Sequence, residues 1–386
     1  MTLFSDDMRR NPFPVYEQMR KASPLFYEPQ TGLWMVFDYE SVKWALTDHE
    51  TFSSRNGPDW IVFTDPPRHT KLRALISKAF TPKSVANLEP RIRELSRGLL
   101  DAAIPHGQMD LVADFATPLP IMVIAEMLGI PPEDRTTFRR WNDVFVRMSY
   151  TIGRRDEQAK RAHADFVAAT PEMSEYLGEI LSRRRSQPQD DLLTRLSSAE
   201  VDGERLTHAD ILNFFQALLL AGSETTTHLL TNAILCFIEH PHELARVRQD
   251  PPLLPSAIEE VLRFRTPLQW MYRITRRDVE LHGQTIPAGK MILPIIGSAN
   301  RDEKIFPDAD RFDVTRTPNP HIAFGNGIHF CMGAPLARLE SRVALTELLE
   351  RAKDFRLAND QPWEPREGLH VHGPSRLPIR FDVKSR

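Results

Sequence analysis

The sequence predicts a mainly α-helical protein with small β sheets. Apolar residues recur at helical spacing in most segments of the 386-residue chain, and the longest such segment, 206–240, is apolar enough to cross a core. Runs of β-branched and aromatic residues are short by comparison and are bounded by turn residues. No internal repeat and no low-complexity linker divides the chain, so we expect residues 1–386 to form a single domain.

Composition narrows the class of protein. Hydrophobic residues make up 41% of the chain and charged residues 26%, so a large core can form. The net charge of -3 gives no reason to expect a nucleic-acid partner. Two cysteines, Cys236 and Cys331, cannot build a disulfide framework and favour a reducing cytoplasm. The N-terminus has no apolar signal region, and no run reaches the roughly 18 apolar residues of a membrane anchor.

The first 80 residues predict helices around one hairpin. A helix over 12–22 precedes a hairpin over 24–39, and a second helix begins near residue 41. A loop then leads to Asp65, a suitable N-cap for a basic helix with proline at its first position. His69 and Arg73 are four residues apart on one face of that helix. This face suits an anion, but a plain solvated basic helix fits the spacing equally well.

The middle of the chain predicts several packed helices. A helical period runs over 85–103, and the apolar segment 118–132 predicts a buried helix ended by Gly129 and Pro131. Amphipathic helices are expected over 133–150 and 156–181. The junction between them, near residues 150–154, is a candidate lid.

The long apolar segment 206–240 contains polar residues that a core helix accommodates at a cost. Thr207 is a suitable cap, and the centre reads AGSETT, with Glu224 beside two threonines. One face carries mostly small side chains and lets a flat ligand lie against the helix: Leu218, Ala221, Gly222 and Thr225. The alternative is a kinked helix whose threonines bond back to the main chain.

The last 130 residues predict a helix, short strands and a terminal hairpin. Glu260 and Arg263 are three apart on the helix and can pair. An extended segment follows Pro267, and the tail from 368 reads as a hairpin. Two histidines in the tail, His370 and His372, are too few for a metal site.

The stretch FGNGIHFCMG, from Phe324 to Gly333, is the most specific motif in the chain. Cys331 lies where this glycine-rich loop enters a helix, and unpaired N–H groups there predict a lowered thiol pKa. Glycines in the loop let the backbone approach whatever the sulfur holds. A cysteine in arbitrary context is more often a small buried hydrophobe, but these surroundings favour a ligand.

The stretch resembles the haem-thiolate signature of the cytochromes P-450, Phe-Gly-x-Gly-x-His-x-Cys-x-Gly. The resemblance extends from Asn11 to Phe381 and implies the P-450 fold, haem b, and Cys331 as the axial ligand of its iron. It implies that the haem carboxylates meet four cationic or imidazole side chains: His69, Arg73, Arg273 and His329. Further haem contacts are expected from Ala221, Gly222, Phe324, Gly325 and Gly333.

Resemblance assigns roles to three other groups of residues. Glu224 and Thr225 match the acid–alcohol pair that guides protons to the haem site. Glu260 and Arg263 match the structural Glu-x-x-Arg, with Arg311 as the later arginine, although Ala309 and Asp310 replace the usual residues before it. The pocket is expected to be lined by Trp60, Phe63, Leu218, Ala221, Leu268, Gln269 and Trp270.

The resemblance implies a monooxygenase that inserts one oxygen atom from O2 into a lipophilic small molecule by hydroxylation or epoxidation. Electrons would come from a separate ferredoxin or flavodoxin with its reductase, docking on the face behind Cys331 where Lys71, Lys78 and Arg338 are candidates. The short loop 55–64 predicts an open apolar pocket for a terpenoid, steroid, fatty acid or polyketide.

Other classes of function stay open. A peroxide-driven haem-thiolate oxygenase is the main alternative, although the Glu224–Thr225 pair argues against it. A non-catalytic haem-binding or gas-binding protein has no need of such a pair. A thiol hydrolase using Cys331 and His329 lacks an orienting acid.

Overall fold

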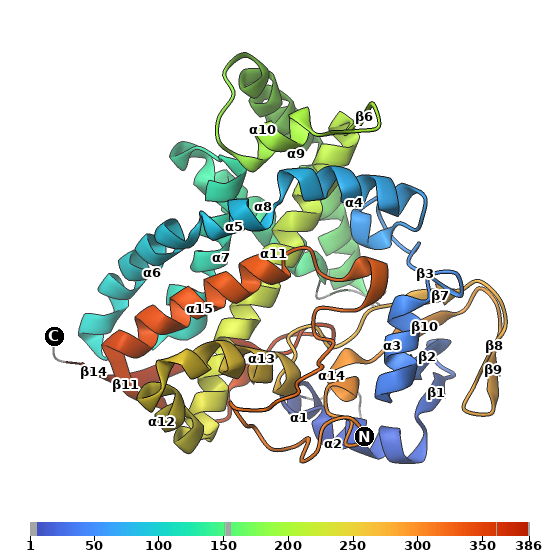
Figure 1. Ribbon diagram of the computed structural model, residues 1–386, viewed down its shortest axis with the longest axis vertical. Coiled ribbons are helices and arrows are strands. Elements are labelled where there is room, and N and C mark those ends of the chain that lie inside the picture. The colour runs from blue at the N-terminus through green and yellow to red at the C-terminus, as the bar shows by residue number, and fades with distance from the viewer. Residues whose placement is uncertain (1–5, 150, 152–155, 360, 385–386) are drawn as a thin grey trace.

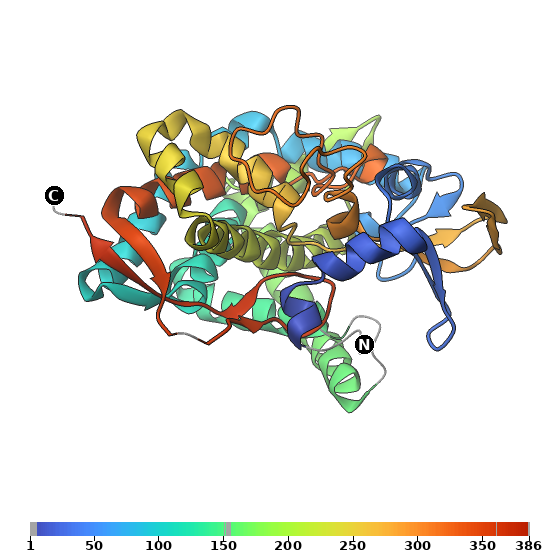
Figure 2. The ribbon, with the colours of Figure 1, turned by 90° about the horizontal axis from the view of Figure 1, so that it is seen from below.

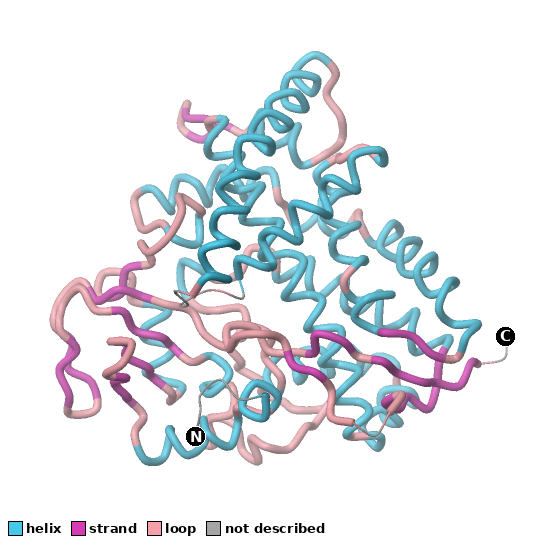
Figure 3. The backbone as a smooth tube through the Cα atoms, turned by 180° about the vertical axis from the view of Figure 1, so that it is seen from behind, coloured by secondary structure: helices cyan, strands magenta, loops and turns pink. Residues whose placement is uncertain are grey.

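The computed structural model confirms the mainly α-helical fold with small sheets (Figure 1). It describes every residue except 1–5, 150, 152–155, 360 and 385–386. The expected lid near 150–154 therefore falls mostly outside the described residues. The outline is roughly triangular, with α9, α10 and β6 at one corner and the larger sheets near the other two (Figures 1 and 3).

One long helix, α11 (His208–Glu239), crosses the molecule and contacts helices on several sides (Figure 1). It begins as predicted: the Thr207 side chain accepts from Asp210 N, and the Asp210 carboxylate accepts from Thr207 N. Most of its residues are buried, as its apolar composition demands. Its neighbours are α7 (Pro118–Leu128), α8 (Arg135–Ser149), α13 (Leu254–Phe264) and α15 (Ala334–Arg351).

A five-stranded sheet lies at one end of the molecule, as Figure 2 shows from below. Its order is β1 (Leu25–Glu28), β2 (Leu33–Val36), β10 (Met291–Pro294), β7 (Arg273–Thr275) and β3 (Phe52–Ser53). The predicted hairpin is β1–β2, paired antiparallel, and β2 pairs parallel to β10. The helices beside it are α1 (Asp6–Arg10), α2 (Phe13–Ala22), α3 (Tyr39–Thr47) and α14 (Ile296–Ala299).

The predicted helical periods over 85–103 and 156–181 are matched by α6 (Glu89–Ala103) and α9 (Glu157–Ser186), and the basic helix after Asp65 by α4 (Arg68–Ala79). Neither α10 (Leu192–Ser198) nor the break between α5 (Pro82–Ala86) and α6 was predicted. Helix α7 ends at Gly129 in the left-handed region, φ 74°, as expected of a C-cap glycine. The prediction that Asp65 caps α4 is wrong, because α4 has no side-chain cap.

The tail is not the predicted hairpin. Strand β13 (Pro374–Arg376) pairs with β12 (Glu364–Pro365), whereas β14 (Pro378–Val383) joins β11 (Ala352–Leu357) and β4 (Gln108–Asp110). Leu377 alone separates β13 from β14, too few residues for a hairpin turn. The remaining pairs are β5 (Glu200–Val201) with β6 (Glu204–Arg205), and β8 (Val279–Leu281) with β9 (Gln284–Ile286). Helix α12 (Pro241–Gln249) follows α11.

One segment, Leu111–Leu128, is long and apolar enough to cross a membrane by length and composition alone. It joins a short π-helical turn (Leu111–Ala116) to α7, and most of it is buried inside the protein. Helix α7 packs against α6 and α11, so the apolar surface of this segment already has partners in the core.

Candidate active site

The cysteine loop, residues 324–333, contains two tight turns and leads into the start of α15. A short 3-10 turn, Gly327–His329, precedes Cys331, whose N–H donates to the Phe324 carbonyl at 2.9 Å. Gly325 and Gly327 have positive φ values of 74° and 71°, which glycine adopts without strain. A Cβ on Gly327 would also lie 3.0 Å from the backbone of Thr47. The loop therefore lies close to α3 at Gly327, where a larger residue would contact the backbone of Thr47.

The expectation that the pKa of Cys331 is lowered is wrong for the thiol by itself. Burial raises the pKa, and the N–H groups of Gly333 and Ala334, with Arg73 and Arg338, offset that effect only in part. A thiolate here needs a stronger positive charge than helix dipole and arginines supply. A coordinated metal ion is such a charge, because it deprotonates a thiol outright.

Four predicted cofactor-binding side chains converge beside the cysteine loop. The rings of His69 and His329 lie 4.2 Å apart, centroid to centroid. His329 Nε2 shares a hydrogen bond of 3.0 Å with Ser54 Oγ, and Arg73 Nη2 donates to the Phe330 carbonyl at 2.8 Å. Arg273 is 3% exposed, and its Nη1 donates to the Tyr272 carbonyl. The helix α4, the cysteine loop and β7 thus bring these groups together from distant parts of the sequence.

Positive charge in this cluster is poorly compensated. Burial, aided by Arg73, lowers the pKa of His69 to about 4, and burial with Arg273 lowers that of His329 to about 3. Burial lowers the pKa of Arg273 to about 10. His69 Nε2 is buried and has no hydrogen-bond partner among the described residues. Within this cluster His69 and Arg273 are buried, whereas Arg73 and His329 are half-buried. Such a cluster fits an anionic group, and the two carboxylates of a haem meet that need.

The nearest carboxylate of the protein is already engaged. Asp65 accepts from Ser53 Oγ, from Ser54 N at 2.9 Å and from Arg276 Nη2 at 2.5 Å. These bonds outweigh burial and lower the pKa of Asp65. This is also why Asp65 does not cap α4: its carboxylate ties the loop before α4 to β3 and to Arg276.

The centre of α11 presents a solvent-reached strip between buried flanks. Ala221 is exposed and Thr225 is half-buried, although both lie mid-helix. Thr225 Oγ1 donates to the Ala221 carbonyl at 2.7 Å, the back-bonding that a threonine in a helix adopts. The glycine at position 222 is explained by helix packing. A Cβ there would lie 2.7 Å from Ile124 Cδ1, so the small residue lets α11 pack closely on α7. The expected direct role of Gly222 toward a flat ligand is therefore weakened.

Glu224 points away from that strip, toward α8. It is 5% exposed, and its Oε2 accepts a hydrogen bond of 2.9 Å from Ser149 Oγ. The two members of the expected acid–alcohol pair thus differ in their surroundings: Thr225 borders the strip, whereas the Glu224 carboxylate lies between the helices.

The predicted roof residues form part of an aromatic stack. Phe63 lies between Trp60, at 5.9 Å and 19°, and Tyr272, at 5.5 Å and 15°. Trp60 is 2% exposed, and its indole N–H donates to Gln216 Oε1 of α11 at 3.2 Å, so it packs in the core instead of lining the pocket as predicted. Phe63 and the neighbouring Ile61 form a 3-10 turn (Ile61–Phe63), so the short loop is tied to α11 and to the segment before β7.

The segment after Pro267 contributes less to the pocket than expected. Gln269 is 2% exposed, and its side-chain amide donates to the Thr266 carbonyl. A Cβ on Gly297 would lie 2.2 Å from Gln269 Oε1, so the side chain fills a notch in the core. Its assignment as a pocket residue is wrong in this structure. Leu268 and Trp270 remain partly exposed, as does Leu218 on α11.

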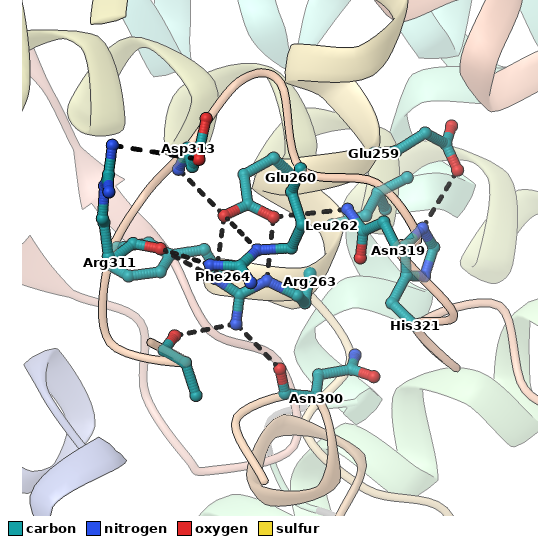
Figure 4. Close-up of polar contacts among 12 residues, drawn as sticks. Glu259, Glu260, Leu262, Arg263, Phe264, Asn300, Arg311, Asp313, Asn319 and His321 are labelled. Carbon is teal, nitrogen blue, oxygen red and sulfur yellow. Dashed lines mark hydrogen bonds and ion pairs between the residues drawn. The ribbon is translucent and has the colours of Figure 1, made fainter. Parts of the chain in front are cut away.

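The predicted Glu260–Arg263 pair is fully buried and anchors a network, shown in Figure 4. Arg263 Nε and Nη2 each donate to the Glu260 carboxylate at 2.8 Å. Its remaining N–H groups donate to the carbonyls of Asn300, Ala309 and Arg311. A bidentate pair that also binds three carbonyls fixes the path of the loop around residues 300–311.

The expected third member, Arg311, is wrong as a side chain. Its guanidinium is 61% exposed, and only its carbonyl takes part in the network. Arg316 takes the place: its Nε donates to Glu260 Oε1 at 3.1 Å, and its other nitrogens reach the carbonyls of Pro307, Asp308 and Arg311. The burial of Arg316, 10% exposed, is the feature that distinguishes it, and no local sequence pattern shows that.

A second chain of contacts links α13 to the cysteine loop. Glu259 accepts two hydrogen bonds from Arg338, at 2.7 and 2.8 Å, and one of 3.0 Å from His321. Burial opposes ionisation of Glu259, but these bonds outweigh it and lower the pKa to about 2. The Arg338 guanidinium lies 4.6 Å from the centre of the Phe324 ring. Arg338 thus acts as a tie between helix and loop.

Comparison with known proteins agrees with this architecture. The cytochrome P450 family profile matches residues 133–376. Cytochrome P450 109 of Bacillus spizizenii is 42% identical over 389 residues, covering 99% of this chain and 95% of its own. The structure of CYP109Q5 from Chondromyces apiculatus superposes with a TM-score of 0.90 at 40% identity, covering 99% of this chain and 98% of that one.

A second solved structure carries a ligand. CYP109E1 from Bacillus megaterium in complex with testosterone has a TM-score of 0.90 and 38% identity, and covers 97% of this chain and 100% of its own. A family profile that spans more than half of the chain, together with relatives aligned over nearly its whole length, leaves no other family to consider. The chain belongs to the cytochrome P450 family and is a haem b monooxygenase.

Proposed function

We propose that Cys331 is the axial ligand of the haem iron and that residues 1–386 form one haem domain. The observation that carries this proposal is the cysteine loop, where Gly325 and Gly327 turn the backbone and two N–H groups point at the sulfur. Donors of this kind orient and tune a bound ligand. Burial holds the thiol protonated until a metal ion is bound, so thiolate formation and iron binding are coupled.

The haem carboxylates are assigned to the partly buried cluster of His69, Arg73, Arg273 and His329. Arg273 and Arg73 supply charge, and His69 and His329 supply ring nitrogens. Phe324, Gly325 and Gly333 would border the cofactor from the cysteine loop, whereas Ala221 would border it from α11. The haem, when bound, supplies the activation of dioxygen.

Each turnover inserts one oxygen atom of O2 into the substrate and reduces the other to water with two electrons and two protons. We assign delivery of these protons to Glu224 and Thr225. The hydroxyl of Thr225 borders the solvent-reached strip of α11, and the adjacent Glu224 carboxyl stands behind it as the titratable group. Bound haem and a lipophilic substrate would cover this strip and exclude bulk water from the reacting site.

The substrate is proposed to be lipophilic: a terpenoid, steroid, fatty acid or polyketide. Apolar side chains supply the partly exposed surface near α11 and the aromatic stack, among them Leu218, Leu268, Trp270 and Phe63. The relative in complex with testosterone supports a steroid as a member of this class.

Electrons are proposed to come from a ferredoxin or flavodoxin with its reductase, in the cytoplasm. The docking face is the surface around the cysteine loop, where Phe330 is 41% exposed. Two of the cations expected there are partly committed: Lys71 pairs with Glu204 at 2.7 Å, and Lys78 donates to the Glu200 carbonyl. Arg338 is bound to Glu259. An acidic partner would compete with Glu204 for Lys71. An ion pair this exposed contributes little free energy, so it can be replaced.

The central assignment is tested by the absorption spectrum of the reduced protein with and without carbon monoxide. A strongly red-shifted main band is expected for the wild type, because thiolate ligation changes the electronic structure of the iron. Cys331→Ala is expected to lose that band, while Cys236→Ala, a change at the other, fully buried cysteine, retains it. A red-shifted band that persists in Cys331→Ala would refute the assignment.

A further inference from the structure

The carboxyl group of Glu224 is bound at the end of a neighbouring helix. Ser149, the last residue of α8, donates through Oγ to Glu224 Oε2 at 2.9 Å. Both residues are 5% exposed, so the contact is shielded from bulk water. A hydrogen bond in such surroundings holds the position of a carboxyl group more firmly than a surface contact does.

The same hydroxyl has a second acceptor at a similar distance. Ser149 Oγ lies 2.8 Å from the Val146 carbonyl, one turn earlier in α8. A serine hydroxyl has one proton and two lone pairs, so it donates to one acceptor at a time. With Glu224 ionised, the proton points to the carboxylate. With Glu224 protonated, the hydroxyl can donate to the Val146 carbonyl and accept a hydrogen bond from the carboxyl O–H.

We propose that Ser149 is a positioning residue for Glu224, which holds the carboxyl group in one place in both of its protonation states. This inference rests on the proposed role of Glu224 in proton delivery. A group that delivers two protons per turnover alternates between the acid and its anion, and each state needs a partner. Rotation of one hydroxyl satisfies both states, and no heavy atom has to move.

The chain contains a matched control in the same interface. Ser223, beside Glu224 on α11, donates through Oγ to Asn142 Oδ1 of α8 at 2.6 Å and lies 2.8 Å from the Leu219 carbonyl. This is also a buried serine between the same two helices with a main-chain acceptor and a side-chain acceptor. Its side-chain acceptor is an amide that does not titrate, so Ser223 tests helix packing without proton transfer.

The experiment compares Ser149→Ala, Ser149→Thr and Ser223→Ala in the haem-loaded protein. Product formed per reduced nicotinamide cofactor consumed is measured with a surrogate ferredoxin and reductase. The substrate is testosterone, or the screened lipophile that gives the largest spin-state shift. Ser149→Ala is expected to lower this ratio about fivefold, the factor that one ordinary hydrogen bond is worth. Ser149→Thr and Ser223→Ala are expected to retain it, with the dissociation constant of the substrate unchanged in all three.

A readout independent of turnover is the urea unfolding midpoint in a double-mutant cycle. Ser149→Ala and Glu224→Gln are expected to be non-additive, whereas Ser223→Ala and Glu224→Gln add. The inference is overturned if Ser149→Ala uncouples no more than Ser223→Ala does, or if its effect persists undiminished in the Glu224→Gln background.

Failure of the proposed function gives a different pattern. If Glu224→Gln itself keeps the wild-type ratio of product to cofactor, then the proton role of Glu224 is wrong, and the inference falls with it. If Glu224→Gln uncouples but Ser149→Ala does not, then the role of Glu224 stands and only the role of Ser149 is refuted.

Discussion

Replacement of Arg316 tests whether the buried network around Glu260 stabilises the cysteine-loop half of the fold. The change Arg316→Gln removes one charge-assisted hydrogen bond, at 3.1 Å to Glu260, and three bonds to the carbonyls of Pro307, Asp308 and Arg311. Glu260 keeps its two bonds from Arg263, so no buried charge is left alone.

The cost is estimated from those contacts. The bond to Glu260 contributes about 1.5 to 2 kcal/mol because one partner is a buried carboxylate. The three carbonyl bonds contribute less than about 1 kcal/mol each, because water can reach part of that loop after the substitution. We therefore expect Arg316→Gln to lower the free energy of unfolding by about 3 kcal/mol.

The matched control is Arg311→Gln. The Arg311 guanidinium is 61% exposed, and its ion pair with Asp313 is 4.0 Å long. Its carbonyl, which does take part in the network, survives the substitution. A change of less than about 0.5 kcal/mol is expected.

The assay is urea unfolding of the haem-loaded proteins, followed by tryptophan fluorescence, with haem retention read from the absorption spectrum. Arg316→Gln is expected to unfold at lower urea and to release haem earlier, and Arg311→Gln to follow the wild type. Equal losses for the two variants, or a larger loss for Arg311→Gln, would contradict the replacement of Arg311 by Arg316 in the network.

Three further predictions concern groups elsewhere in the chain. Burial raises the pKa of Glu340 to about 8 from 4.5, so the folded state keeps a proton that the unfolded state loses, and stability falls as pH rises from 4.5 to 8. Glu340→Gln should remove this pH dependence, worth up to about 5 kcal/mol, in unfolding curves measured at pH 5 and pH 8.5. Thr225→Ala should leave substrate binding intact and lower the product formed per electron pair; an unchanged ratio would favour the peroxide-driven alternative. Lys71→Glu should lower the rate at which an acidic ferredoxin reduces the protein and should reduce the dependence of that rate on salt concentration. A rate that does not change with salt in either the wild type or the variant would argue against docking at this face.

Local patterns predicted local structure well. The capping box of α11 requires only Thr207 and Asp210, three residues apart, and the end of α7 requires only Gly129. The fold and the family were predicted from the resemblance that begins with the motif around Cys331, and such a motif is readable because it depends on the order of residues within a short stretch. Helix periods gave the number and approximate limits of the long helices for the same reason.

Predictions failed where a distant partner decides the structure. Asp65 has the chemistry of an N-cap, but Arg276, 211 residues later, binds its carboxylate instead. Gln269 lies in a segment expected to line the pocket, yet its side chain fills the notch at Gly297. The contact of Ser149 with Glu224 was not predicted, because serine is common at helix ends and nothing in the sequence places the Glu224 carboxylate beside it. Each of these depends on tertiary contacts that spacing along the chain does not encode.

The pKa of Cys331 shows how two correct local rules can predict the wrong sign. Unpaired N–H groups and nearby arginines do lower the pKa, as expected at the start of a helix. The same fold that brings these donors to the sulfur also surrounds it with protein atoms, and the loss of solvation raises the pKa by more than the donors lower it. A thiol that stays neutral by itself and becomes an anion only with a bound cation binds iron with release of one proton. Iron binding at this site is therefore expected to strengthen as pH rises, and it adds its free energy to the stability of the folded state.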